Sequence, residues 1–383
     1  MTTNFSRNPI PLVCNSAFAS QPNFRYELQA KILNPVSGNY ETVFTLKGRP
    51  ASDGEYVFDV QKLHALLSPD LPAFNQSNIL IGDKSLKMWR ATVQEWWGTP
   101  VATLRSSYDT TPEAILMAGL SFRSWPGNNF FEQNIETYKQ FLTWQPAVKT
   151  VSPEQQEYLY YLTANQSWGS IYRHGQVVFT DNSTMAIPPI NTAVSDNLCI
   201  IPVGFDQMDL ASLNPAKKVK KYTVWVSGTS NPAIGKSEER TYIVDHEYYK
   251  HQRYFLYQNS LGGFETLRCT GKFEDNIEVL QQEGERVLPA MYDKGSAAYF
   301  AFSTRYDYGF KANAGPLDAA SKRHLIEFLI SGHRYEILRD GFAPIRLLKD
   351  KEALVKDYET MPEFEFEYKY AFQNHAYDTI TGY

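Results

Sequence analysis

The segment 363–372 near the C-terminal end of the chain restricts the fold most. Aromatic side chains occupy its even positions, and charged or small side chains occupy its odd positions. Because side chains of a β-strand point alternately to the two faces of a sheet, this pattern predicts a strand with one wholly aromatic face. Each buried aromatic side chain contributes about 2 kcal/mol, so protein must cover that face. The aromatic positions are Phe364, Phe366, Tyr368, Tyr370 and Phe372.

The aromatic face can be covered in two ways. In the first, the strand closes a sheet of its own domain, as most amphipathic strands do. In the second, the strand or the polar tail 373–383 reaches a neighbouring subunit by edge pairing. Both alternatives remain open at this point, and the five aromatic residues are therefore candidate interaction residues.

The rest of the chain also favours β-structure. Residues 24–32 alternate between apolar and polar side chains, and residues 222–226 are rich in β-branched and aromatic side chains. Turn residues separate short strands of this kind at intervals of about ten residues, which is typical of immunoglobulin-like or fibronectin-like sandwiches. Apolar residues recur at helical spacing in 317–329 after Pro316, which predicts one helix there. The sequence predicts a mainly β protein of several sandwich modules with this single helix.

The length of 383 residues exceeds the size at which one hydrophobic core keeps growing. We expect four modules. They are an N-terminal β-sandwich at 1–111, a β-rich middle domain at 112–214, an immunoglobulin-like or fibronectin-like module at 215–283, and a C-terminal β domain with the helix at 284–383. The aromatic share of 14% favours strands and is also typical of interaction surfaces.

Charge and cysteine content exclude several classes of protein. The net charge is −5 and the only basic run is the short stretch 217–221, whereas nucleic-acid binding needs a concentrated positive surface. Cys14, Cys199 and Cys269 are too few and too widely spaced for a disulfide framework, so we expect reduced, buried thiols. No secretion signal and no apolar run long enough to span a membrane is evident, so we expect synthesis in a cytoplasm.

The motifs that resemble catalytic or binding signatures are incomplete. His246 and His251 are five residues apart, which places them on different faces of a helix or a strand and prevents binding of one metal. Gly235-Lys236-Ser237 resembles the end of a phosphate-binding loop, but it lacks the earlier glycine and a following helix. We therefore expect a protein that is not an enzyme, with no catalytic residue, no cofactor and no metal.

Two alternatives of another class depend on how side chains meet in space. A pair of carboxylates about 5–10 Å apart in a cleft would favour a glycan hydrolase on a β-sandwich scaffold. An exposed row of tryptophans would favour a carbohydrate-binding module, although tryptophan is more often buried in a core. The candidate carboxylates are Glu132, Glu136, Glu265 and Asp275, and the candidate tryptophans are Trp96, Trp97, Trp125 and Trp168.

Four stretches together resemble a known group of proteins. They are residues 5–10, residues 141–146 with 156–160, residues 253–266 and residues 364–372. The set resembles uncharacterised virion proteins of the tail or baseplate type, from tailed bacteriophages and prophages of Bacteroidetes hosts. These stretches span most of the chain but contain no catalytic signature.

The resemblance implies a structural protein of the virion tail that is made in the bacterial host cytoplasm. It implies a tail-tip or baseplate component that joins other tail proteins, as a homo-oligomer or ring within a larger assembly. A glycan of the host surface is the partner expected for a receptor-recognition module, which is the alternative role. We expect neither nucleic acid nor a membrane span.

Overall fold

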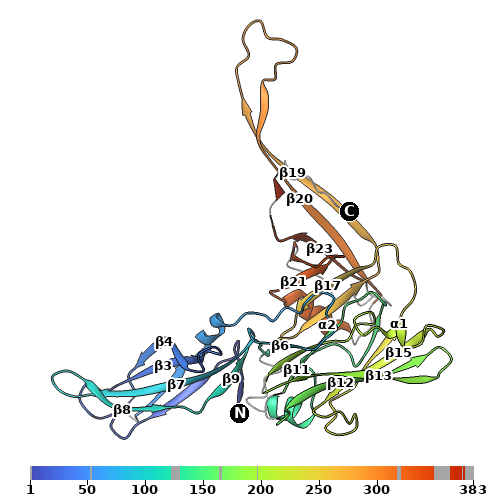
Figure 1. Cartoon of the computed structure of the whole chain (residues 1–383). Coiled ribbons are helices and arrows are strands. Elements are labelled where there is room, and N and C mark those ends of the chain that lie inside the picture. Colours follow the sequence, from blue (N-terminus) through green and yellow to red (C-terminus); the bar gives the residue numbers. More distant parts are fainter. Residues whose placement is uncertain are drawn as a thin grey trace, which may run out of the picture. The chain divides into compact units, whose positions relative to one another are not determined.

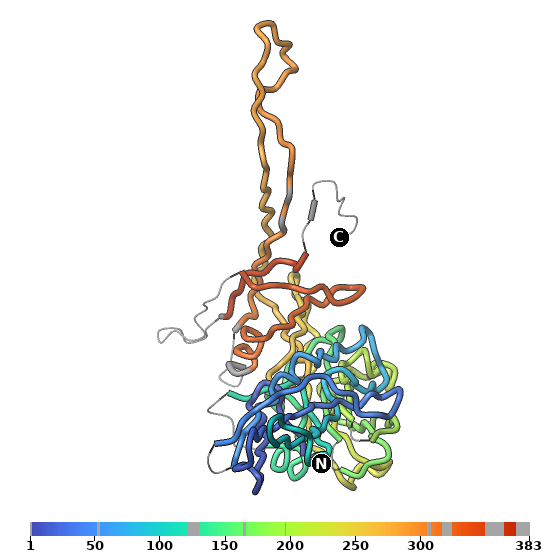
Figure 2. The backbone as a smooth tube through the Cα atoms, turned by 90° about the vertical axis from the view of Figure 1, so that its left-hand side faces the viewer, coloured from blue at the N-terminus to red at the C-terminus, as the bar shows by residue number. Residues whose placement is uncertain are grey.

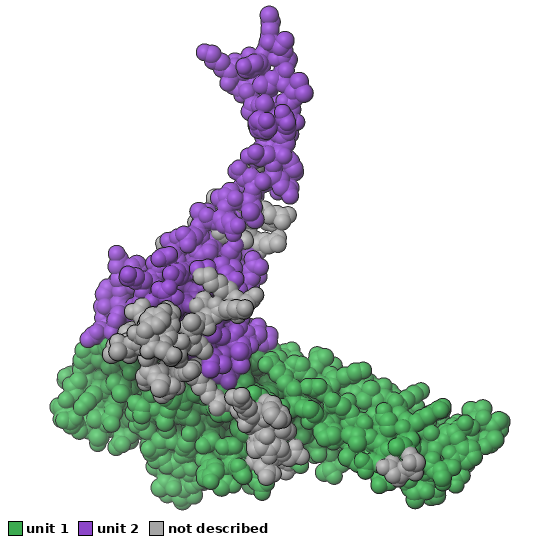
Figure 3. Space-filling view, turned by 180° about the vertical axis from the view of Figure 1, so that it is seen from behind, with its two compact units in different colours: residues 1–246, 258–265 green, residues 247–257, 266–383 purple. Residues whose placement is uncertain are grey.

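The structure is a computed structural model that describes residues 2–51, 54–121, 130–163, 166–195, 197–316, 321–348, 363–372 and 374–375. The chain forms two compact units (Figure 3). Unit 1 contains residues 1–246 and 258–265, and unit 2 contains residues 247–257 and 266–383. Of the described residues, strands hold 49% and helices 8%, which confirms the prediction of a mainly β protein.

The first part of unit 1 is a six-stranded sheet in which β7 lies between β3 and β9. Its strands are β1 (Thr3–Phe5), β3 (Arg25–Leu33), β4 (Tyr40–Gly48), β7 (Leu86–Trp97), β8 (Thr103–Asp109) and β9 (Glu113–Leu116). A two-stranded sheet of β2 (Pro11–Asn15) and β5 (Glu55–Asp59) and the helix η1 (Gln61–Leu66) accompany it. The apolar and polar residues that alternate in the sequence of β3 are alternately buried and half-buried in the structure. The buried residues Tyr26, Leu28 and Ala30 point into the core.

The second part of unit 1 contains two sheets that share one core. The five-stranded sheet has the order β10 (Val148–Val151), β16 (Arg240–Val244), β15 (Val219–Ser227), β12 (Ser170–Phe179) and β13 (Thr184–Ala193). The three-stranded sheet has the order β11 (Tyr158–Leu162), β14 (Leu198–Pro202) and β6 (Leu80–Gly82). Tyr161 and Ile201 of the smaller sheet lie in the same cluster as Val224 and Tyr242 of the larger one. The short helices η2 (Phe131–Thr137) and α1 (Leu210–Leu213) complete this part.

Unit 2 is built on an eight-stranded sheet with the order β18-β17-β21-β22-β23-β20-β19, in which β24 also pairs with β20. The strands are β17 (Arg253–Gln258), β18 (Phe264–Cys269), β19 (Phe273–Glu285), β20 (Tyr299–Pro316), β21 (Arg334–Ile337), β22 (Phe342–Leu347), β23 (Glu363–Tyr370) and β24 (Asn374–His375). Helix α2 (Ser321–Ile330) packs Leu325 and Phe328 into the core of the sheet. The predicted helix at 317–329 is therefore confirmed from residue 321, and its first residues lie outside the described part of the chain.

The sheets do not follow the four predicted ranges. In the range 215–283, β15 and β16 belong to the five-stranded sheet, whereas β17, β18 and β19 belong to the eight-stranded sheet. No separate module closes within this range, because β15 pairs with β12 across a long stretch of sequence, from Tyr172↔Ser227 to Phe179↔Val219. Likewise β9, which follows residue 112, belongs to the N-terminal sheet. Alternation identifies a strand but not its partner, so the sequence could not assign these pairings.

The loop between β17 and β18 is tight and contains two glycines, Gly262 and Gly263. Gly262 has a φ of +92°, and a side chain there would place its Cβ atom 2.9 Å from the carbonyl oxygen of Met117. The Oδ1 atom of Asn259 accepts hydrogen bonds from the backbone N–H groups of Leu261 and Gly263, each at 3.0 Å. The loop thus requires a residue without a β-carbon at position 262.

We expect Gly262→Val to lower the free energy of unfolding by about 3 kcal/mol, at the upper end of the cost of a strained backbone. Chemical denaturation measures this change. Gly38→Val is the matched control, because Gly38 has a φ of +69° but no atom within 4 Å of the position that a β-carbon would take. Gly38→Val therefore isolates the backbone strain from the steric clash, and it should lower the free energy of unfolding by less than Gly262→Val does. Equal unfolding free energies for Gly262→Val and the wild-type protein would contradict this account of the loop.

Candidate interaction surface

The structure brings most of the predicted aromatic face of 363–372 into the core of unit 2. Phe364 and Phe366 are 2% exposed and Tyr368 is fully buried. Phe366 lies 5.1 Å from Phe255 and 4.8 Å from Phe328, measured between ring centroids. Tyr370 is half-buried, and Phe372 stacks on it while staying exposed. The first alternative, closure of the strand's own sheet, is therefore what the structure contains.

The second alternative, edge pairing by this strand with another subunit, is not open at residues 368–369, where both edges of β23 are paired within the chain. One edge of β23 pairs with β20, with Phe310 opposite Tyr368, and the other edge pairs with β22, with Ile345 opposite Tyr370. Where both edges are occupied, the strand has no free backbone groups to offer a partner, and for the rest of the strand edge pairing stays a prediction. Of the tail 373–383, the described residues 374–375 pair with β20, and the remainder lies outside the described part of the chain.

The strands β19 and β20, next to β23, continue as a two-stranded hairpin beyond the rest of the sheet (Figures 1 and 2). β23 pairs with β20 only at residues 309–316, and β24 pairs at residues 305–306. The ladder of β19 and β20 nevertheless runs on from Phe273↔Ala312 to Glu285↔Tyr299. We call residues 281–304, the part with two strands and the turn between them, the arm.

Large apolar side chains of the arm are exposed. Val287 and Met291, in the turn, are 97% and 96% exposed. The other large apolar side chains exposed on the arm are Tyr292, Tyr299, Phe300 and Phe302. An isolated two-stranded hairpin is at best marginally stable in water, and contiguous exposed apolar surface usually marks a site of interaction. The arm is therefore the described surface of unit 2 best suited to bind another protein.

The base of the arm is anchored in the core of unit 2. The cross-strand pairs Ile277↔Tyr308 and Val279↔Tyr306 place four apolar side chains on one face. The ring of Tyr308 stacks on that of Phe310 at 6.1 Å, and Phe310 in turn stacks on Tyr368 at 5.1 Å. The aromatic face of the arm's base thus continues directly into the hydrophobic core, which fixes the direction in which the hairpin leaves the sheet.

The strand β19, which runs from the sheet into the arm, is acidic. β19 is the end strand of the described sheet, and it contains five carboxylates and no basic residue. The carboxylates are Glu274, Asp275, Glu278, Glu283 and Glu285. Lys369 binds Glu278 at 2.7 Å and leaves the strand's overall charge negative. Charged side chains keep an edge strand from pairing indiscriminately, and they favour a partner of opposite charge.

The sequence contains a signal for the arm of the same kind as the one in 363–372. Phe300, Phe302, Tyr306, Tyr308 and Phe310 occupy even positions, as the aromatic residues of 363–372 do. The same argument from alternation would have predicted a second aromatic strand at 299–310. The alternation would not have shown that the outer half of this strand is exposed, because its exposure depends on where β23 ends.

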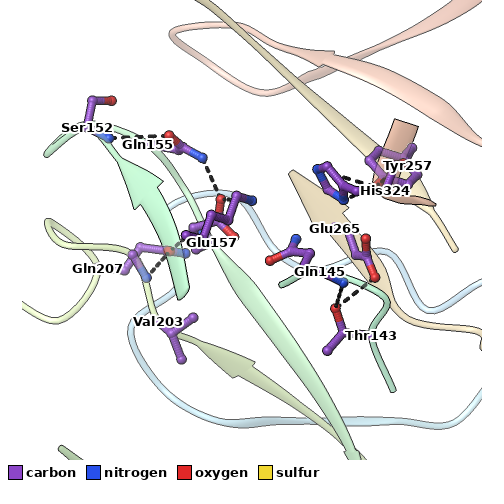
Figure 4. Close-up of polar contacts among 12 residues, drawn as sticks. Thr143, Gln145, Ser152, Gln155, Glu157, Val203, Gln207, Tyr257, Glu265 and His324 are labelled. Atoms are coloured by element: carbon purple, nitrogen blue, oxygen red, sulfur yellow. Dashed lines mark hydrogen bonds and ion pairs between the residues drawn. The ribbon is translucent and has the colours of Figure 1, made fainter. Parts of the chain in front are cut away.

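The candidate carboxylate Glu265 of unit 1 serves structural hydrogen bonds (Figure 4). Glu265 is 1% exposed and accepts hydrogen bonds from Thr143 Oγ1 at 2.8 Å, the backbone N–H of Trp144 at 2.8 Å and Asn259 Nδ2 at 2.5 Å. It thereby ties two loops together. A second carboxylate, Glu157, accepts hydrogen bonds from Lys149 Nζ and from Gln155 Nε2.

The remaining candidate carboxylates are spread over the chain. Glu132 and Glu136 lie on η2 in unit 1. Asp275 lies on the exposed strand β19 in unit 2. Nothing in the described residues assembles these carboxylates into a hydrolase pair.

The candidate tryptophans do not form a row in the part of the chain that the structure describes. Trp96 and Trp97 are neighbours on β7 and so point to opposite faces. Trp97 stacks on Phe18 at 5.1 Å, and Trp168 stacks on Tyr161 at 5.4 Å against the shared core of unit 1. Trp125 lies outside the described residues. The packing favours a core role for Trp97 and Trp168.

The incomplete motifs have other roles in the structure. His246 Nε2 lies 2.8 Å from the carbonyl oxygen of Val219, whereas His251 belongs to unit 2 and stacks on Phe273. Lys236 lies in the connection between β15 and β16. Its amine is 4.1 Å from the ring centre of Trp225. Among the described residues, no group of three or more His, Cys, Asp or Glu side chains is placed to hold a metal ion.

The three cysteines are free and buried, as predicted. Burial raises the pKa of the Cys14 thiol to about 11 and that of Cys199 to about 12, and it also raises the pKa of Cys269. Since the thiolate is the reactive form, these thiols are poor nucleophiles at neutral pH. They act as small apolar side chains of the cores.

Comparisons with known proteins give no family for this chain. No family model and no curated protein matches it. Among solved structures, the calcium binding domain CBD12 of CALX1.1 matches with a TM-score of 0.19 and 7% identity, over 63% of this chain and 96% of that one. CBD12 from CALX1.2 matches with a TM-score of 0.17 and 8% identity, over the same shares. Scores this low carry no argument about fold or function. In the described residues, no helix is both long and apolar enough to cross a membrane.

Proposed function

We propose that this protein is a non-enzymatic structural subunit of a larger assembly, and that the arm binds a neighbouring protein of that assembly. The observation that carries the proposal is the exposed apolar surface of a hairpin that the sheet of unit 2 does not cover. A domain gains nothing in solution from holding six large apolar side chains in water. The same side chains gain about 2 kcal/mol each when a partner buries them.

The charge of β19 indicates what the partner offers. β19 presents an edge with five carboxylates, and the apolar side chains lie further along the same hairpin. A basic strand edge flanked by apolar residues would complement both features, with backbone hydrogen bonds from strand addition and with opposite charges. The occupant we propose is such an edge on another protein of the particle.

The assembly we propose is the tail of a bacteriophage virion, with the chain as a tail-tip or baseplate component. This part of the proposal rests on the resemblance of residues 5–10, 141–146 with 156–160, 253–266 and 364–372 to tail and baseplate proteins. A ring or another homo-oligomer that contacts other virion proteins agrees with a subunit that extends an arm. In this setting the protein is made in the host cytoplasm and functions in the virion.

Shortening the arm tests the proposal. The pair Gln281↔Thr304 can be closed by Asn-Gly in place of residues 282–303, because this dipeptide forms the two-residue turn of a hairpin. We expect a shortened protein that keeps its far-ultraviolet circular dichroism and its unfolding free energy but no longer enters particles. The matched control replaces the exposed turn 35–38 of unit 1 with Asn-Gly and should enter particles normally. Normal incorporation of the arm-shortened protein would contradict the proposal.

A further inference from the structure

Unit 1 contains a basic surface at the start of β15. Lys217, Lys218, Lys220 and Lys221 are all exposed. Lys217 forms an ion pair with Asp181 at 2.7 Å, whereas the other three lysines form no ion pair with a described residue. We call these three lysines the lysine patch. The patch carries three positive charges that no carboxylate of the described chain neutralises by direct contact.

The lysine patch lies beside the turn that leads into the strand β13. Lys220 Nζ donates a hydrogen bond to Asn182 Oδ1 at 3.3 Å, and the neighbouring Lys217 Nζ donates one to Ser183 Oγ at 2.7 Å. Asn182 and Ser183 connect β12 to β13. The positive charges of the patch therefore lie next to the point at which β13 begins.

β13 is an end strand of its described sheet and contains no charged residue. Most of its residues are exposed, among them Met185 and Ala186. An exposed strand edge offers unpaired N–H and C=O groups, and charged side chains or prolines usually protect such an edge from pairing with another chain. Pro188 and Pro189 are the only such protection in β13, so the segment 184–187 is open to strand addition.

This edge has the properties that β19 requires of a partner. Glu283 and Glu285 are exposed residues of β19 within the arm, and neither forms an ion pair with a described residue. The lysine patch supplies the opposite charges, and the segment 184–187 supplies backbone groups for strand addition. Met185 adds a partly exposed apolar side chain. Both sides of a complementary contact are therefore present on a single chain.

We propose that β19 of one copy of this protein adds to β13 of a second copy, with the carboxylates of the arm facing the lysine patch. The inference rests on the proposed function of the arm, and it identifies the neighbouring protein as another molecule of the same chain. The contact joins two different surfaces, so a pair of copies keeps one free β19 and one free β13. Further copies can then add in succession, as a ring or a filament requires.

Sedimentation equilibrium of the purified full chain, at concentrations up to about 0.1 mM, tests for self-association of micromolar affinity. We expect oligomers at an ionic strength of about 0.05 M. At about 0.5 M the dissociation constant should rise about tenfold, because salt screens the attraction between exposed opposite charges.

Charge reversal locates the contact. One variant carries Glu283→Lys and Glu285→Lys, and the other carries Lys218→Glu and Lys220→Glu. Each reversal places like charges on the two sides of the contact, so each variant alone should associate about tenfold more weakly than the wild-type protein, or weaker still. An equimolar mixture of the two variants should regain the association, because each surface of one variant then meets an oppositely charged surface of the other.

The matched control is Lys62→Glu with Lys84→Glu, which reverses two exposed lysines of unit 1 outside the lysine patch. It should associate as the wild-type protein does, and the melting temperature of each variant shows that it is folded. A wild-type protein that stays monomeric would overturn the inference. Association that neither reversal weakens, or a mixture that associates no more strongly than each variant alone, would overturn it as well.

Failure of this inference can be distinguished from failure of the proposed function. A monomeric protein that enters particles only with an intact arm would overturn the inference alone, because the arm would then bind a different protein. A protein that enters particles normally without the arm would contradict the proposed function, and the inference that rests on it would fall with it.

Discussion

A chain that ends at Glu359 is expected to lose the folded structure of unit 2. Such a chain lacks β23, which lies between β20 and β22 and pairs with both. It also lacks Phe364, Phe366 and Tyr368, which are buried against Phe255 and Phe328. Removal of a buried aromatic side chain costs about 3–5 kcal/mol, so the loss of three, about 9–15 kcal/mol, is comparable to the whole stability of a typical domain.

Limited proteolysis with mass spectrometry measures this loss. We expect cleavage throughout residues 266–348 of the truncated chain. The matched control ends at His375, which keeps β23 and β24 and should resist cleavage as the full chain does. A truncated chain whose unit 2 stays resistant would contradict the role given to β23.

Substitution of the exposed apolar residues of the arm is expected to abolish binding to the neighbouring protein without unfolding the chain. Met291→Ser, Phe300→Ser and Phe302→Ser together change side chains that are exposed, and exposed positions usually alter stability by less than about 0.5 kcal/mol each. If a partner buries them, their loss weakens binding by about 6 kcal/mol, which is roughly four orders of magnitude in affinity. Incorporation into particles, in competition with the wild-type protein, measures the effect.

The control for the arm variant changes the same kind of side chain elsewhere. Val36→Ser, Val101→Ser and Ile234→Ser alter three exposed apolar residues of unit 1. This variant should compete with the wild-type protein on equal terms. Equal incorporation of the arm variant would show that the arm's apolar surface does not bind the partner.

Local patterns in the sequence predicted the strands well. The alternation in 24–32 and in 363–372 recurs as alternating burial in β3 and β23, because strand geometry converts sequence period directly into two faces. Helical spacing predicted α2 for the same reason. These are properties of a single segment, and one segment is enough to read them.

Pairing between distant segments could not be read in this way. The strands of 215–283 divide between two sheets because β15 meets β12, and alternation carries no information about that choice. The arm could not be predicted because its exposure depends on the point at which β23 stops pairing with β20.

Hydrogen exchange of the arm's backbone amides, compared between the free protein and the native particle, tests the central claim most directly. In the free protein the arm has two strands and exposed hydrogen bonds, so its amides should exchange fast. If a neighbouring protein adds a strand to β19 and buries the apolar residues, exchange at 281–304 should slow by about 100-fold or more in the particle. Exchange at the same rate in both states would contradict the account.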